Sequence, residues 1–165
     1  MRWATGSARR LISQFDLSKP PINVRELAAR LKVDVQLKEF PDEVSGALYR
    51  GRERSVIAVN AGHVATRQRF TIAHELGHFM LHHDSPAHYD REKQVGVHFR
   101  AKATGAAWDS KEIEANRFAA ELLMPRKLLI ARVGDSAEFD AAQLAEEFEV
   151  SPEAMTYRLA ELRFA

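Results

Sequence analysis

Apolar and polar positions in the first part of the chain follow two periods, one helical and one strand-like. The helical period predicts helices near Gly6–Phe15 and over Val24–Leu31, with Asn23 as the N-cap of the second. Turn residues separate the stretches that alternate, so a small antiparallel or mixed sheet is expected. The predicted strands are Val33–Phe40, Ser45–Tyr49 and Ser55–Asn60.

The rest of the chain is predicted to be mainly helical. A helix is expected through residues 70–83, with Thr66 as its N-cap, and a polar stretch follows from about 84 to 109. Within that stretch, Val95–Phe99 is a candidate edge strand. A second long helix is expected from Asp109 or Ser110 to near Pro125. Three shorter helices are predicted at Arg126–Ala131, Asp140–Phe148 and Pro152–Leu162.

The first long helix contains the sequence His74-Glu75-Leu76-Gly77-His78, an HExxH pattern. Residues four apart share one face of a helix, so His74 and His78 can hold one metal ion from the same side. Glu75 can then reach a water at that metal without being a ligand. Gly77 is unfavourable inside a helix by about 1 kcal/mol relative to Ala, which indicates close packing or a need for space between the imidazoles.

A catalytic zinc usually has three protein ligands, and a chain with no Cys must supply the third from His, Asp or Glu. Glu114 lies at the edge of the apolar face of the second long helix and is ranked first. Glu112 is ranked second, because with Asp109 as N-cap it occupies N3, where an acidic side chain completes a capping box. Glu121 is ranked third and is expected to form an ion pair with a nearby basic side chain.

The remaining polar candidates carry weaker signals. His82 and His83 are expected to close the first long helix, where a cationic imidazole suits the C-terminal dipole. His63, His88 and His98 are isolated and are interpreted as surface or loop residues. Four residues are candidates for stabilising an oxyanion, and the sequence does not rank them: Tyr49, His88, Tyr89 and Arg100.

Two segments in this order resemble the ImmA/IrrE family of bacterial and phage-related metallo-endopeptidases: residues 69–78, reading RFTIAHELGH, and residues 114–125, reading EANRFAAELLMP. The upstream stretches 45–48 and 57–60 fit the strands that precede the active helix in that family. The resemblance implies that His74, His78 and Glu114 are zinc ligands and that Glu75 is the general base. It also implies a substrate, since family members act on helix-turn-helix repressors of the XRE type, often encoded nearby.

The fold expected is α+β, with a minimal zincin-like domain over residues 1–132. In it, a three- or four-stranded sheet packs on the HExxH helix and on the second long helix, which supplies the third ligand. Residues 133–165 are expected to form a helical hairpin packed on this domain rather than an independent one. The hairpin resembles the start of a helix-turn-helix, but it is acidic where a DNA reader is basic. Direct DNA binding is therefore not expected.

Composition agrees with one globular domain, at 165 residues, 45% hydrophobic and 28% charged, with 24 basic and 23 acidic side chains. No apolar run approaches the length of a membrane span, and no signal-peptide h-region is present, so a cytoplasmic protein is expected. The prediction is a zinc-dependent endopeptidase, with Mn²⁺ or Fe²⁺ as other possible metals. The alternative is a regulatory module that binds a repressor or another protein without cutting it.

Overall fold

The computed structural model describes residues 2–81, 87–91, 110–134 and 139–163. The sheet contains β1 (Val33–Lys38), β2 (Val44–Arg50), β3 (Ser55–Asn60) and β4 (Ala87–Arg91). The helices are α1 (Arg2–Gln14), α2 (Val24–Arg30), α3 (Ala65–Leu81), α5 (Ser110–Leu123), α6 (Arg126–Val133), α7 (Ala141–Phe148) and α8 (Pro152–Leu162).

The sheet is mixed and has the strand order β1-β3-β2-β4. β1 runs parallel to β3, whereas β2 is antiparallel to both β3 and β4. Alternation along β2 and β3 directs Leu48, Ile57 and Val59 to one face, where all three are buried. The opposite face carries Tyr49, which is 61% exposed. Only one side of these strands therefore contributes to the core.

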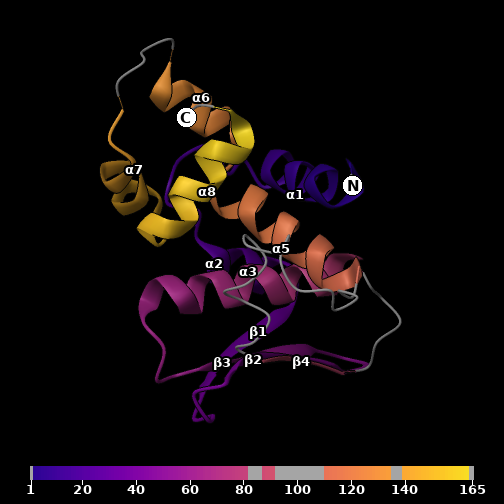
Figure 1. The fold of residues 1–165 in the computed structure, drawn as a ribbon. Coiled ribbons are helices and arrows are strands. Elements are labelled where there is room, and N and C mark those ends of the chain that lie inside the picture. Colours follow the sequence, from indigo (N-terminus) through magenta and orange to yellow (C-terminus); the bar gives the residue numbers. More distant parts are fainter. Residues whose placement is uncertain (1, 82–86, 92–109, 135–138, 164–165) are drawn as a thin grey trace.

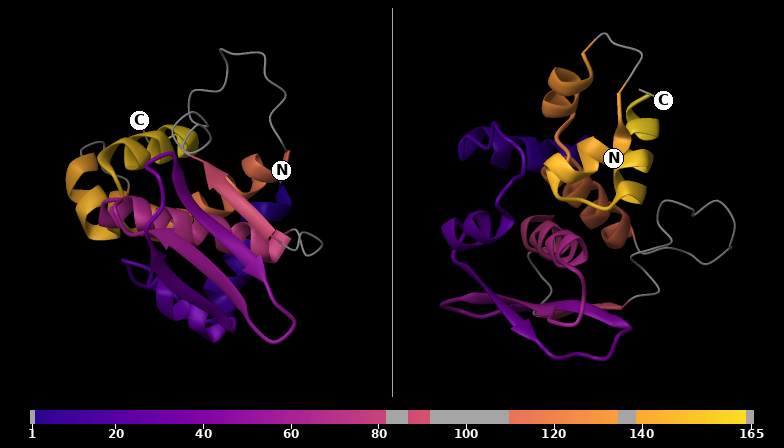
Figure 2. Two further views of the ribbon diagram at one scale, coloured as in Figure 1. Left: turned by 90° about the horizontal axis from the view of Figure 1, so that it is seen from below. Right: turned by 90° about the vertical axis from the view of Figure 1, so that its left-hand side faces the viewer.

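Helix α3 lies between the sheet and α5, with α2 beside it above the sheet, so it is covered on both sides (Figures 1 and 2). It packs on β2 and β3 below, while α5 crosses it from above and α1 packs in turn on α5. An α-helix that is covered on both sides is apolar around most of its surface. The polar side chains of α3 that lie in this layer, which include His74, Glu75 and His78, are consequently buried.

The C-terminal helices join the same core through the end of α5. Phe148 of α7 and Met155 of α8 are fully buried. Arg158 of α8 is 2% exposed and donates hydrogen bonds to the carbonyl oxygen of Met124, at 3.2 Å, and to the carboxylate of Glu121. At the turn between α7 and α8, the Glu149 carbonyl oxygen accepts a hydrogen bond from Arg69 of α3 at 3.1 Å.

The α+β class and the small sheet are confirmed, with four strands among the residues that the structure describes. The N-cap of α2 is also confirmed, since the Asn23 side chain accepts a hydrogen bond from the Glu26 amide at 3.1 Å. The N-cap predicted at Thr66 is wrong, because α3 already begins at Ala65. The sequence did not predict β4, which is built from a polar stretch. The strand predicted at Val95–Phe99 lies outside the described residues.

Candidate metal centre

Two imidazoles meet on the α5 side of α3. His74 and His78 are one helical turn apart, and their Nε2 atoms are 3.0 Å from each other. Their exposed fractions are only 1% and 4%. Glu75, between them in sequence, is completely buried. The helical spacing that the HExxH pattern predicts is therefore present, and its three polar side chains are buried inside the protein rather than exposed at its surface.

The third group of the cluster is Glu112, in the first turn of α5. Its Oε1 is 3.2 Å from Nε2 of His78, and its Oε2 is 3.4 Å from Nε2 of His74. One potential ligand atom from each of these three residues lies within 4.8 Å of the other two. The carboxylate bridges the two rings from the facing helix, so the cluster depends on how α3 and α5 cross.

That crossing is close because Gly77 has no side chain. A Cβ atom at Gly77 would lie 3.0 Å from Cα of Ala115 and 3.1 Å from its carbonyl oxygen, tighter than ordinary contacts. The backbones of α3 and α5 therefore approach at Gly77 and Ala115, less than one turn from Glu112. Of the two explanations that the sequence offered for Gly77, close packing is the one that the structure supports, and it brings the carboxylate within reach of the rings.

Two further contacts fix the histidines. The Oδ1 atom of Asn116 accepts a hydrogen bond from Nδ1 of His74 at 2.8 Å. On the other side of α3, the guanidinium of Arg50 donates a hydrogen bond to the backbone carbonyl oxygen of His78 at 2.5 Å and lies over the Phe79 ring. Arg50 thus holds the last turns of α3 against the end of β2.

The electrostatics of the cluster favour an ionised Glu112. Burial raises the pKa of this carboxyl group, but its interactions with His74 and His78 lower it by more, so the pKa lies well below its usual range. Near neutral pH the side chain is therefore a carboxylate, which is the form that binds metal ions.

The donor set fits a small divalent cation. Ligand atoms about 2.0–2.1 Å from a tetrahedral zinc ion lie roughly 3.3 Å from one another. The three separations among Nε2 of His74, Nε2 of His78 and the Glu112 oxygens are 3.0, 3.2 and 3.4 Å. Two nitrogen donors and one carboxylate are also the ligand types that catalytic zinc sites use. These residues can hold such an ion from one side and leave a further position for water.

The ranking of the acidic candidates needs a correction. Glu112, and not Glu114, faces the histidines, because residues two apart point about 200° away from each other around a helix. Glu114 is only partly buried and is not part of the cluster. The capping role expected for Glu112 involved Asp109, which lies outside the described residues. One feature of the sequence does point to Glu112 as the third ligand: Glu112 and Asn116 are four residues apart, so they lie on the same face of α5.

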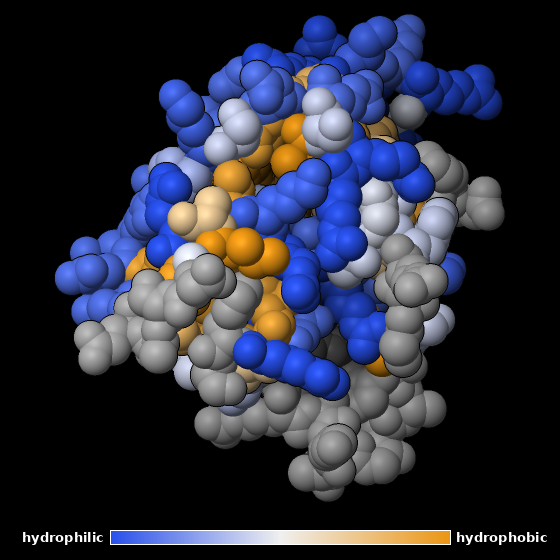
Figure 3. Space-filling model, turned by 90° about the horizontal axis from the view of Figure 1, so that it is seen from above, coloured by the Kyte–Doolittle hydropathy of each residue, from blue (hydrophilic) through white to orange (hydrophobic). Residues whose placement is uncertain are grey.

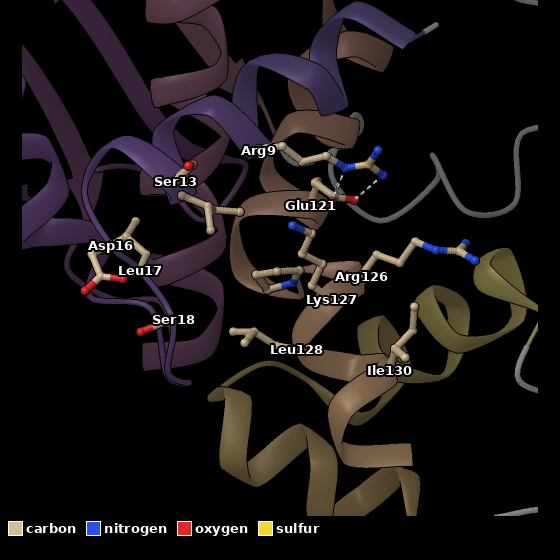
Figure 4. A pocket seen from close by; sticks show the side chains of 12 residues that line it. Arg9, Ser13, Asp16, Leu17, Ser18, Glu121, Arg126, Lys127, Leu128 and Ile130 are labelled. Carbon is tan, nitrogen blue, oxygen red and sulfur yellow. Dashed lines mark hydrogen bonds and ion pairs between the residues drawn. The ribbon is translucent and has the colours of Figure 1, made fainter. Parts of the chain in front are cut away.

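Glu121 has the structural role that the sequence predicted for it. Its carboxylate accepts a hydrogen bond from Arg9 at 2.8 Å and pairs with the buried Arg158. It lines a cavity of about 520 Å³ between α1 and the start of α6, together with Ile12, Leu128 and Ile130 (Figure 4). From above, apolar side chains gather in the middle of this face of the molecule, bordered by hydrophilic ones (Figure 3).

The remaining candidates are not brought to the cluster by any described contact. Tyr49 lies on the face of the sheet opposite to Leu48 and α3, so it is excluded as an oxyanion donor. His63 follows β3 and its Nε2 lies 3.2 Å from the carbonyl oxygen of Asp42. His82, His83, His98 and Arg100 lie outside the described residues, as do the side chains of His88 and Tyr89.

Comparison with known proteins identifies the class. Residues 28–160 match the family model described as the IrrE N-terminal-like domain, a peptidase family. The chain is 26% identical over 140 residues to metallopeptidase ImmA of Bacillus subtilis (strain 168), covering 85% of this chain and 76% of that protein. It is also 29% identical over 119 residues to uncharacterized immunity region protein 2 of Bacillus phage phi105, covering 72% and 66% of the two chains.

A solved structure is similar to this chain in its fold. The chain superposes on a Mycobacterium tuberculosis transcriptional regulator with a TM-score of 0.66 and 18% identity. The match covers 97% of this chain but 47% of the regulator, so this chain spans less than half of that protein. The family match covers most of the sequence, and the chain belongs to the ImmA/IrrE family of metallopeptidases.

Among the described residues, no helix combines the length and the apolar character that crossing a bilayer requires.

Proposed function

We propose that this chain is a zinc-dependent endopeptidase whose metal ligands are His74, His78 and Glu112. The observation that supports this most directly is the buried cluster of two imidazole nitrogens and one carboxylate, with separations near those of tetrahedral ligands. Glu75 is buried beside the first ligand. A purely structural metal site has no need of that carboxylate.

The residues of the site have two roles, which are binding the cation and transferring protons. His74 and His78 bind it from α3, and Glu112 binds it from α5. When bound, a zinc ion supplies Lewis acidity, which lowers the pKa of water at the site and polarises the scissile carbonyl. Glu75 accepts a proton from the attacking water on a carboxylate oxygen and delivers it to the leaving amide nitrogen.

Zinc is the metal proposed because two histidines and one carboxylate form the donor set of many catalytic zinc sites. The same donors accept Mn²⁺ or Fe²⁺, and availability of the metals decides between them. Metal analysis of the purified protein identifies the ion that is bound.

The proposed substrate is a helix-turn-helix repressor of the XRE type, encoded near this chain, whose cleavage releases stress-response or mobile-element genes. The phage relative named for an immunity region and the family membership support a regulatory substrate of this kind. The proposed location is the cytoplasm, where such a repressor acts.

The test compares wild type with Glu75→Gln, using the XRE-type repressor from the neighbouring gene as the probe. We expect the variant to retain bound metal and repressor binding but to cleave about 10²–10⁴-fold more slowly, since a general base contributes about that factor. Gel analysis gives the rate, and mass spectrometry of the fragments gives the cleaved bond.

Two results would contradict the proposal. If neither protein cleaves the repressor but both bind it, the chain is a non-cleaving regulatory module. If both cleave it at the same rate, Glu75 is not the base.

A further inference from the structure

Asn116 contacts the metal cluster through a hydrogen bond to His74, although it is neither a candidate ligand nor the base. It lies on α5 one turn after Glu112, so both residues share a helix face directed at α3. Its exposed fraction is 7%, and its Oδ1 is 2.8 Å from Nδ1 of His74. The contact joins the two helices directly behind the first ligand.

The chemistry of this contact sets the proton on His74. An amide oxygen accepts hydrogen bonds and cannot donate them, so the proton of the neutral ring must be on Nδ1. The lone pair is then on Nε2, the atom that faces His78 and Glu112. Asn116 therefore selects the tautomer that binds metal and fixes the plane of the ring.

The contribution of Asn116 to folding stability does not by itself explain why an amide occupies this position. Among the residues that the structure describes, its buried Nδ2 atom has no hydrogen-bond acceptor. A buried amide that leaves a donor unsatisfied stabilises a fold less than an apolar side chain of similar shape. Asn60 offers the contrast: its Nδ2 is within hydrogen-bond range of backbone carbonyl oxygens at Pro41 and Val44, as expected of a structural amide.

We propose that Asn116 is a positioning residue of the metal site, which holds His74 in the Nδ1–H tautomer and thereby raises its affinity for the cation. The inference rests on the metal centre proposed above. Outer-shell partners of histidine ligands typically change metal affinity by about 10- to 100-fold, and they do so by orienting the ring. An amide also gives this orientation without adding another negative charge beside Glu75 and Glu112.

The first experiment measures zinc affinity, with metal-free proteins titrated against a chromophoric chelator. Asn116→Ala is expected to bind Zn²⁺ about 10- to 100-fold more weakly than wild type. Asn116→Asp keeps an oxygen acceptor and is expected to retain wild-type affinity or exceed it. The matched control is Asn60→Ala, which should lower the urea midpoint of the metal-free protein but leave zinc affinity unchanged.

The second experiment needs no variant. Nitrogen NMR of the His74 ring in metal-free wild type is expected to show the Nδ1–H tautomer, whereas a free imidazole of histidine prefers Nε2–H. An Nε2–H signal would overturn the inference even if Asn116→Ala failed to fold.

The outcomes also separate this inference from the proposed function. If wild type binds no zinc, the metal centre itself is wrong, and the role of Asn116 is overturned with it. If wild type binds zinc and Asn116→Ala binds it equally well, only the role of Asn116 is wrong. Parallel losses of zinc affinity and stability in both alanine variants would indicate that Asn116 is merely structural.

Discussion

Glu112 and Glu114 are separated by one residue, yet only the first lies beside the histidines. Both are acidic positions near the edge of the apolar face of α5, and they differ in the direction in which they leave the helix. The rotation of α5 about its axis therefore decides which of the two carboxylates reaches the histidines, and amino-acid composition does not. This difference can be measured directly.

Glu112→Ala is expected to weaken zinc binding by more than about 100-fold, because it removes a proposed ligand rather than a residue behind one. Glu114→Ala is the matched control on the same helix and is expected to change zinc affinity by less than about twofold, since its side chain is outside the cluster. Chelator competition on the metal-free proteins measures both. The reverse order of effects would restore Glu114 as the ligand.

At the scale of elements, the cluster depends on the close crossing of α3 and α5. Glycine permits that crossing, although it is unfavourable inside a helix by about 1 kcal/mol relative to alanine. The neighbouring atoms at Gly77 belong to the backbone of Ala115, which cannot rotate out of the way as a flexible side chain does. Helix propensity and helix packing therefore oppose each other at this residue.

Gly77→Ala is expected to lower the free energy of unfolding by about 1–2 kcal/mol, because overpacking against α5 exceeds the gain in helix propensity. Urea denaturation measures it. The control is Gly6→Ala in α1, where a Cβ would meet nothing within 4 Å. That change should raise the unfolding free energy by about 0.5–1 kcal/mol. A stabilised Gly77→Ala protein would show that the two helices can separate without cost.

At the scale of the whole molecule, Glu121 joins three helices that are distant in sequence. Its carboxylate pairs with Arg9 of α1 and with Arg158 of α8, and both side chains of the second pair are 2% exposed. A charge buried to this extent is tolerated only while its partner is present. The pair thus fixes the C-terminal helices to the end of the helix that carries Glu112.

Glu121→Ala is expected to lower the free energy of unfolding by about 3–5 kcal/mol, since it leaves the Arg158 guanidinium buried without its main partner. Glu147→Ala removes an exposed pair with Arg132 and should cost less than about 1 kcal/mol. Thermal and urea unfolding give both values. Similar small losses in the two variants would mean that water reaches Arg158.

Much of the element order followed from the sequence because it is a local property. Periodicity located the three strands before the HExxH helix, and the cap at Asn23 located the start of α2. The start expected at Asp109 or Ser110 agrees with α5, which begins at Ser110 in the described residues. β4 escaped prediction because a polar strand is stabilised by the partner it pairs with, here β2. Thr66 was misread because a good capping residue also occurs one position inside a helix.

By itself, the sequence determined the half of the site that lies on one helix: His74, Glu75 and His78 are held by a spacing of one turn, and a helix fixes that spacing wherever it is placed. The other half was decided only by the tertiary structure. The rotation of α5 and its approach at Gly77 selected Glu112 over Glu114 and placed Asn116 behind His74. Distances between two helices depend on how their surfaces pack, and the spacing of residues along the chain does not determine that packing.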